Sequence, residues 1–319
     1  MPNRSIRGLD IFCGVGGSST GARAAGVELR AAIDMCPIAT ATYHDNCKST
    51  TVLTSRLEDI DLVELKAVTG QIDILIASPE CTNHTCAKGA APRSETSRGT
   101  AFQVIRFAKD IKARWVVVEN VPHMRSWRRY SAWLAELRKL GYHIREQVLN
   151  AADFGVPQGR RRLFVMCDLD RQPRAVRQRR RQKKCAATIL SPNDDFAFSP
   201  LYAAGRAIPT LQRAERAIAS VGNHSPFLLV YYGSDAAGGW QRLDVPLRTV
   251  TTLDRFALVR PTRHGHEMRM LQVPELKKAM GFSTSYRLEY GTRRDKIRLL
   301  GNAVSPPVMA AVIKALTHL

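Results

Sequence analysis

Short apolar stretches of strand length alternate with helix-like stretches over residues 1–167, and this alternation constrains the fold most. The expected strands are Gly8–Phe12, Leu29–Ile33, Ile72–Ala77, Trp115–Glu119, Ile144–Leu149 and Arg162–Met166. The expected helices lie near Ser19–Ala25, Ile38–Asn46, Ala101–Ala113 and Ser131–Leu140. Repeated strand–helix–strand units give a mostly parallel sheet with helices on both faces. The sequence therefore predicts an α/β fold that binds ligands at the carboxyl edge of its strands.

A cysteine follows the third expected strand. Ile72–Ala77 is broken by Ser78 and Pro79, so Cys81 lies in the loop past the carboxyl end of the strand, with His84 nearby. A thiolate in such a polar loop has the access that a nucleophile needs. The alternative for an isolated cysteine is a small buried hydrophobic side chain. We interpret Cys81 as a nucleophile because the rest of the chain supports that role.

A glycine-rich loop joins the first strand to the first helix. Gly14, Gly16 and Gly17 allow the backbone to turn tightly and to approach a ligand at the helix N-terminus. Asp34 ends the next strand, where an acidic residue holds the hydroxyls of a ribose. The loop is neither a Walker loop nor the full dinucleotide fingerprint, so a nucleoside cofactor without a pyrophosphate fits better. The alternative is an ordinary tight turn.

Two further groups of polar residues lie next to expected strands. Glu119 ends one strand on the same edge as Cys81, and a carboxylate beside a thiol suits acid or hydrogen-bond chemistry. The alternative is an acidic residue that caps a strand end. Arg160 and Arg162 precede another strand and would bind a phosphate or a base, or form a solvated basic turn.

Charge is the strongest signal of the composition. The chain has 48 Lys and Arg against 28 Asp and Glu, a net charge of +20, which favours a polyanionic partner such as nucleic acid. The 7 cysteines are odd in number and scattered, which is typical of a reducing compartment. No Cys/His pairing completes a zinc site, and we expect no metal. No apolar run reaches the length of a signal peptide or a membrane span, so we expect a soluble intracellular protein.

The alternating pattern stops near residue 170. Residues 171–184 form a basic run without an apolar face, which suits phosphates, although a disordered solvated tail is the alternative. Residues 223–247 mix aromatic, amide and charged side chains with glycines and are expected to discriminate bases. A last helix, Pro306–Leu316, is apolar enough to pack back onto the first domain.

Together these residues resemble the DNA (cytosine-5)-methyltransferases, with the motifs in the family's order over nearly the whole chain. The matching segments are the donor loop Asp10–Gly17, the ribose acid Asp34, the catalytic loop Ser78–Thr82, the donor-side segment Ser97–Phe102, Glu119–Val121, the residues Gln158, Arg160 and Arg162, the segment Leu247–Thr252 and the closing segment Gly301–Pro307. One such match is weak, but the ordered set is specific.

The resemblance implies a Rossmann-like class I methyltransferase that acts on a flipped-out cytosine in double-stranded DNA, with S-adenosyl-L-methionine as donor. It implies that Cys81 attacks the ring, that Glu119 stabilises its N3 side and that Arg160 and Arg162 hold its other edges. The implied cofactor residues are Phe12, Gly14, Gly16, Gly17, Asp34, Met35, Asp59, Pro79, Asn302 and Val304. The implied substrate residues are Gln158 and Thr249.

The implied organisation is a catalytic domain at 1–170, a small target-recognition region at 171–260 and a C-terminal segment at 261–319 that returns to the catalytic domain. We expect a cytoplasmic prokaryotic or phage-encoded monomer without a membrane partner, and a cognate restriction endonuclease is a candidate partner. Two other functions stay open: an RNA (tRNA) methyltransferase of the same fold, and a catalytically silent DNA-binding protein.

The chain departs from the family's pattern beside the expected nucleophile. The family usually has Pro before the cysteine and Gln after it, where this chain has Glu80 and Thr82. A neighbouring carboxylate raises the pKa of a thiol unless it points away. The register of Cys81 relative to its strand is kept, and Cys86 lies further along the loop.

Overall fold

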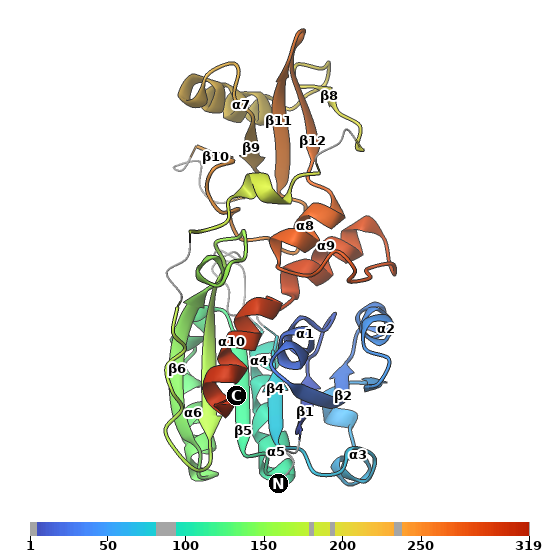
Figure 1. Ribbon diagram of the computed structural model, residues 1–319, viewed down its shortest axis with the longest axis vertical. Helices are drawn as coiled ribbons and strands as arrows, with labels where there is room; N and C mark the ends of the chain where they lie inside the picture. The colour runs from blue at the N-terminus through green and yellow to red at the C-terminus, as the bar shows by residue number, and fades with distance from the viewer. Residues whose placement is uncertain (1–4, 81–93, 179–181, 192–194, 233–237, 319) are drawn as a thin grey trace.

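The computed structural model describes residues 5–80, 94–178, 182–191, 195–232 and 238–318, which form two sheets drawn one above the other in Figure 1. Some residues that the sequence analysis singled out lie outside these ranges. They are Cys81, Thr82, His84, Cys86, Arg179, Arg180, Arg181, Gly233, Ser234 and Asp235.

The first sheet has the strand order β3-β2-β1-β4-β5-β7-β6 within the described residues. All neighbours are parallel except the pairs that β7 makes with β5 and β6. The short connection from β6 to β7 explains this reversal, because a parallel pair needs a long crossover. The mostly parallel α/β sheet is thus confirmed. Its strands are β1 (Ile6–Ile11), β2 (Val27–Asp34), β3 (Thr51–Thr54), β4 (Ile74–Ala77), β5 (Trp115–Asn120), β6 (His143–Asn150) and β7 (Arg161–Asp168).

Helices cover both faces of this sheet. On one face α3, α5 and α6 pack in a single core with alternate residues of the central strands. On the other face α1 and α10 share a second core with the opposite residues of the same strands, and α2 packs beside them. The helices of this part are α1 (Gly17–Ala24), α2 (Pro37–Asn46), α3 (Leu62–Thr69), α4 (Glu95–Gly99), α5 (Ala101–Ile111) and α6 (Tyr130–Lys139), with 3-10 turns η1 (Leu57–Asp59), η3 (Pro122–Ser126) and η4 (Ala151–Phe154).

The second sheet is antiparallel, with the order β10-β9-β11-β12-β8 among the described residues. One face packs against α7, and the other packs against the turn η5 and α8. Figure 1 shows this sheet above the carboxyl edge of the first. Its elements are η5 (Ala186–Ile189), β8 (Ser199–Pro200), α7 (Ile208–Val221), β9 (Phe227–Val230), β10 (Trp240–Arg242), β11 (Phe256–Thr262) and β12 (Gly265–Met270).

Three helices lead the chain back to the first sheet: α8 (Val273–Ala279), α9 (Arg293–Asn302) and α10 (Pro306–Thr317). The helices α8 and α9 begin with capping boxes, at Gln272 with Glu275 and at Thr292 with Asp295. The helix α10 lies beside α1 (Figure 1). Gly21 permits this close contact, because a Cβ there would lie 2.4 Å from the carbonyl oxygen of Pro306.

One stretch, residues 293–317, contradicts the expectation that no apolar run reaches the length of a membrane span. Taken together, α9 and α10 are long and apolar enough to cross a membrane by length and composition. However, 67% of the apolar window is buried inside the protein, and residues 303–305 separate the two helices. Their apolar side chains pack into two cores, one with α8 and a face of the second sheet and the other between α10 and the first sheet.

The start of the basic run lies along the edge strand β6. Gln147 exchanges two hydrogen bonds of 2.9 Å with the backbone of Val176, and Arg145 donates to the carbonyl of Pro173. The expectation of a run without an apolar face is wrong at Val176, whose side chain is buried in a core with α10. One apolar residue among cations therefore anchors this segment.

Candidate active site

The ends of β4 and β5 meet at the carboxyl edge of the first sheet. The side chain of Asn120 donates a hydrogen bond of 3.0 Å to the carbonyl oxygen of Pro79 and accepts one from the Val121 amide. This contact fixes the segment that leads into residue 81 against the strand that carries Glu119. Pro79 thus contributes its backbone to the site, while the expected nucleophile Cys81 lies outside the described residues.

Glu119 and Arg162 form a buried ion pair at this edge. Arg162 Nε lies 3.1 Å from Glu119 Oε1, and the two side chains are 15% and 8% exposed. They come from the neighbouring antiparallel strands β5 and β7, in which Glu119 is paired with Phe164. Since Arg162 and Phe164 are two residues apart, they face the same side as Glu119.

The electrostatics of Glu119 combine two opposing effects. Burial raises the pKa of the Glu119 carboxyl, while the nearby guanidinium groups of Arg162 and Arg160 lower it. Glu119 Oε1 makes no hydrogen bond with the rest of the described structure. The pair lines a narrow cavity with apolar walls, whose other residues are Leu149, Ala151, Arg160, Phe164, Val304, Ser305 and Val308. The arrangement supplies a hydrogen-bonding acid and a cation to a group held in a dry site.

Arg160 binds to the backbone around this cavity. Its guanidinium donates to the carbonyls of Val250, Gly301 and Ala303 at 2.8–3.0 Å, and its side chain is buried. These hydrogen bonds join the β7 side of the site to the segment before β11 and to the C-terminal end of α9. Arg160 therefore lies next to Glu119, but its guanidinium N–H groups donate to backbone carbonyls of the protein.

Gln158 and Thr249 reinforce the same junction. Gln158 is fully buried, donates to the Ala279 carbonyl and accepts from the Val250 amide, both at 3.0 Å. The Thr249 hydroxyl donates to the Gly159 carbonyl at 2.8 Å. These contacts connect the first sheet to the segment that leads into the second. They favour a positioning role for both residues.

A cradle of backbone and carboxylate groups follows β1 and β2. Asp34 accepts hydrogen bonds of 2.9 Å from the amides of Gly14 and Cys36. Burial raises the pKa of Asp34, and these two hydrogen bonds lower it. Phe12 and Gly14 have positive φ, of 57° and 51°, and a Cβ on Gly14 would meet nothing within 4 Å. Open space therefore lies beside the backbone at Gly14, where a ligand can approach.

The other two glycines of the loop serve close packing. A Cβ at Gly16 would lie 2.8 Å from the Tyr43 ring, and one at Gly17 would lie 2.1 Å from the Val304 carbonyl oxygen. The loop thus meets the closing segment, in which Val304 is buried and Asn302 is exposed. Both glycines were expected to contact a ligand, and no local pattern in the sequence signals this packing.

Two expected cofactor residues lie nearer the surface. Met35, directly after Asp34, is 65% exposed. Asp59 is exposed at the end of η1, which follows β3, the neighbour of β2.

A buried network under the cradle was missed. Asp10 Oδ2 accepts from the hydroxyls of Ser18 and Ser19 at 2.5 and 2.6 Å, and the Tyr43 hydroxyl donates to Ser19. Burial raises the pKa of Asp10 to about 7. A carboxylate within an apolar strand that precedes a glycine loop was the available signal. The network fixes the start of α1 against β1.

The expected base-discriminating segment contains one residue with a supporting role. Gln241 is buried, accepts from the Arg248 amide at 3.0 Å and donates to the Arg242 and Pro246 carbonyls. Arg242 is exposed and forms a 2.6 Å ion pair with Asp244. Gln241 and Arg242 line a pocket of about 470 Å³ together with Trp240 and Arg248.

The mostly parallel sheet with helices on both faces is the Rossmann-like fold of class I methyltransferases, and a family comparison agrees. A family model described as C-5 cytosine-specific DNA methylase matches residues 6–318. This chain belongs to the C-5 cytosine-specific DNA methylase family. The resemblance expected from the motifs is confirmed.

Known proteins differ in how much of the chain they match. Type II methyltransferase M.XorII of Xanthomonas oryzae pv. oryzae is 31% identical over 169 residues, which cover 50% of this chain and 39% of that protein. This match spans less than half the length of the relative. Type II methyltransferase M1.HphI of Haemophilus parahaemolyticus is 26% identical over 338 residues, 98% of this chain and 86% of the relative. The solved structure of Entamoeba histolytica methyltransferase EhMeth has the same fold, with a TM-score of 0.71, 18% identity and 99% of both chains covered.

Proposed function

We propose that this protein is a DNA (cytosine-5)-methyltransferase, a cytoplasmic monomer that transfers a methyl group from S-adenosyl-L-methionine to a flipped-out cytosine in duplex DNA. The observation that carries the proposal is the buried Glu119–Arg162 pair, 3.1 Å apart on the sheet edge that also carries the Asp34 cradle. Relatives named as type II methyltransferases support it, and they make a cognate restriction endonuclease a candidate partner.

The cradle suits a nucleoside donor. The open space at Gly14 admits a ligand against the backbone, and each Asp34 oxygen keeps acceptor capacity for a ribose hydroxyl. Bound S-adenosyl-L-methionine would supply an electrophilic methyl group. Besides Gly14 and Asp34, the residues that we propose to hold or border it are Phe12, Gly16, Gly17, Met35, Asp59, Pro79, Asn302 and Val304.

Cys81 supplies the nucleophile in this proposal. Carbon 5 of cytosine is a poor nucleophile, so the Cys81 thiolate first adds to carbon 6 and forms a C–S bond. The electron pair displaced from the ring double bond makes carbon 5 nucleophilic, and carbon 5 takes the methyl group. A base then removes the proton of carbon 5, and the pair left behind re-forms the double bond as the Cys81 thiolate leaves.

Glu119 and Arg162 stabilise the ring while Cys81 is attached. Addition at carbon 6 places negative charge on the N3 and carbonyl side of the ring. Glu119, whose pKa burial raises, donates or shares a proton at N3. Arg162 faces the ring carbonyl, and Arg160 holds the surrounding backbone through its three carbonyl contacts. Gln158 and Thr249 shape the same wall.

The proposed division of labour follows the two sheets. Residues 1–170 carry the catalytic machinery, residues 171–260 recognise the target, and residues 261–319 return the chain to the first sheet. The second sheet continues through β12 to Met270, so its last strand lies in the third segment.

Covalent trapping tests the proposal and the nucleophile together. DNA with 5-fluorocytosine should trap the protein irreversibly when the methyl donor is present, because fluorine does not leave as the proton does. Cys81→Ser should abolish trapping, whereas Cys86→Ser should preserve it. The reverse pattern would contradict the assignment of Cys81.

Competition between duplex DNA and tRNA as methyl acceptors separates the proposal from an RNA methyltransferase. We expect duplex DNA to be methylated and tRNA to compete poorly. DNA binding without transfer to either acceptor would identify a catalytically silent protein.

A further inference from the structure

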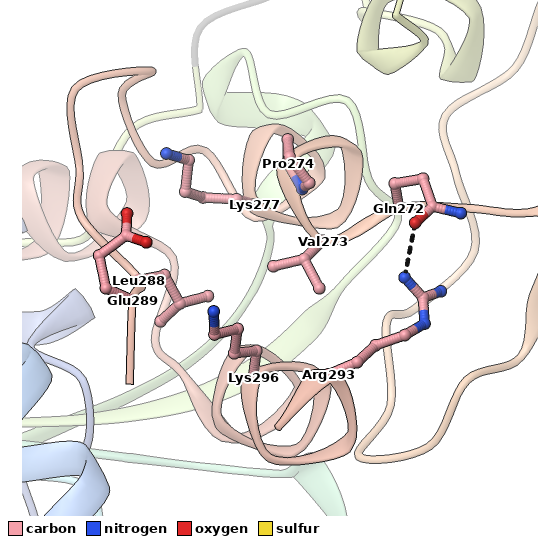
Figure 2. A pocket seen from close by; sticks show the side chains of 8 residues that line it. All are labelled: Gln272, Val273, Pro274, Lys277, Leu288, Glu289, Arg293 and Lys296. Atoms are coloured by element: carbon pink, nitrogen blue, oxygen red, sulfur yellow. Dashed lines mark hydrogen bonds between the residues drawn. The ribbon is translucent and has the colours of Figure 1, made fainter. Parts of the chain in front are cut away.

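A second pocket lies between α8 and α9, away from the Glu119 cavity. It has a volume of about 420 Å³ and shares no residue with that cavity (Figure 2). Its apolar surface comes from Val273, Pro274 and Leu288. Its polar surface comes from Gln272, Lys277, Glu289, Arg293 and Lys296.

The three cations of this pocket differ in the number of hydrogen bonds that their side chains make with the protein. Arg293 binds Asp254, Gln272 and the Leu271 carbonyl. Lys277 donates to two backbone carbonyls, those of Thr284 at 2.9 Å and Tyr286 at 2.6 Å. These two cations hold the walls of the pocket together.

Lys296 is available to a ligand. Figure 2 shows its side chain rising from α9 toward Leu288, and it is half-buried. Its ammonium group makes no hydrogen bond or ion pair with any other residue that the structure describes. The ammonium nitrogen is not among the buried polar atoms of the described structure, so a ligand anion can reach it.

The charges around the pocket select an anion. Three cations face one carboxylate, that of Glu289, which interacts with Lys277. The charge of Lys296 is therefore left for a ligand. The whole chain carries +20, which makes a polyanion the favoured class of partner. Apolar surface beside a free ammonium group suits a sugar next to its phosphate.

We propose that the α8–α9 pocket binds a backbone phosphate of duplex DNA, with the attached deoxyribose against Val273 and Leu288. This inference rests on the proposed function, since it assigns a second contact to the same substrate. The helix α8 follows β12 within three residues, and α8 and α9 lie between the two sheets (Figure 1). In this proposal a duplex bound at the catalytic edge extends to the pocket through its flanking base pairs.

The test compares Lys296→Gln with Lys66→Gln, an equal charge change on α3. Lys66 is exposed, and α3 lies at the opposite end of the first sheet (Figure 1). Binding to a long duplex is measured over a range of salt concentrations. Lys296→Gln should weaken binding and reduce the slope of log K against log salt by about 0.9, the value for one phosphate that the protein neutralises. Lys66→Gln should leave the affinity and the salt slope unchanged. Lys296→Arg keeps the positive charge and should give the affinity and slope of the unaltered protein.

Further measurements separate the outcomes. A short duplex that covers only the target should be bound and methylated equally by Lys296→Gln and the unaltered protein. An unchanged salt slope with the long duplex would overturn the inference. The inference is also overturned if inorganic phosphate or a deoxynucleoside monophosphate binds at Lys296 while the salt slope with DNA is unchanged. The pocket would then be a site for a small molecule. If no duplex is methylated by the unaltered protein, the proposed function fails, whatever the slopes.

Discussion

The Ser97 hydroxyl donates a hydrogen bond of 2.6 Å to Glu80 Oε2. Ser97 lies in α4, whose first turn is capped by the side chain of Ser94. The carboxylate of Glu80, which stands where the family usually has proline, is therefore attached to a helix. This attachment limits how far the Glu80 charge can move relative to the residue that follows it in the chain.

Removal of the Glu80 charge should make Cys81 react at lower pH. A neighbouring negative charge raises the pKa of a thiol, so Glu80→Gln should lower the apparent pKa of trapping by 5-fluorocytosine DNA. The measurement is the rate of trapping against pH. Glu58→Gln, an exposed change in η1, is the matched control and should leave the profile in place. Identical profiles for Glu80→Gln and the unaltered protein would show that the carboxylate does not affect the thiol.

Glu119→Gln should reduce methyl transfer by orders of magnitude. The amide keeps the size of the side chain but cannot supply a proton to the ring. Binding of S-adenosyl-L-methionine, measured by calorimetry, should hardly change because the Asp34 cradle lies on other strands. An equal loss of donor binding and of transfer would instead make Glu119 a structural residue.

Arg160 and Arg162 should separate stability from catalysis. Arg160→Met leaves three buried carbonyls without their donor and should lower the free energy of unfolding by roughly 3 kcal/mol. Arg162→Met removes the cation that we propose to face the ring carbonyl, so it should reduce transfer. Its change in stability should be smaller, because Glu119 can take up a proton when its partner is lost. Urea denaturation and single-turnover rates measure the two effects. Equal destabilisation by the two variants would contradict this separation.

The buried Asp10 should make the protein less stable as the pH rises. Its pKa is raised from 3.8 to about 7, so the folded state holds a proton that the unfolded state releases. Stability should therefore fall between about pH 4 and pH 7. Over this window the loss should be as much as about 4 kcal/mol relative to Asp10→Asn, which cannot titrate. Urea denaturation at several pH values checks it, and parallel curves for the two proteins would contradict it.

Periodicity in the sequence predicted the strands and helices with long apolar patterns, because those patterns follow from burial. It missed β3, since Thr51–Thr54 is only four residues long. It also missed α3, whose apolar residues are spread around the helix and do not mark one face, since Val63 and Val68 are exposed. Glu119 and Asp34 could be predicted as site residues because each one lies at the end of an apolar strand. The Ser97–Glu80 hydrogen bond and the packing of Gly17 against Val304 depend on residues far apart in the chain. No local pattern encodes such contacts.

The second region offers a test of which residues hold DNA and which read its sequence. Arg177, Lys183 and Lys184 belong to the basic run beside β6, and the side chain of Lys183 is 52% exposed although it pairs with Asp153. Such cations suit phosphates, which carry no sequence information. Replacement of all three by Ala should weaken binding to every duplex alike. The salt slope should fall by about 0.9 for each phosphate that the variant no longer neutralises, and the methylated sequence should stay the same.

Changes near β10 should have the opposite effect. Gln241→Ala removes the support of the segment from 241 to 248, and Arg242→Ala removes an exposed donor from the same pocket. Both should alter which cytosines are methylated, because base edges are read by donors and acceptors held in place. Methylation-sensitive sequencing of DNA from cells that express each variant measures the preference. If the basic-run variant changes the methylated sequence while both β10 variants preserve it, recognition lies in the basic run and the proposed division is wrong.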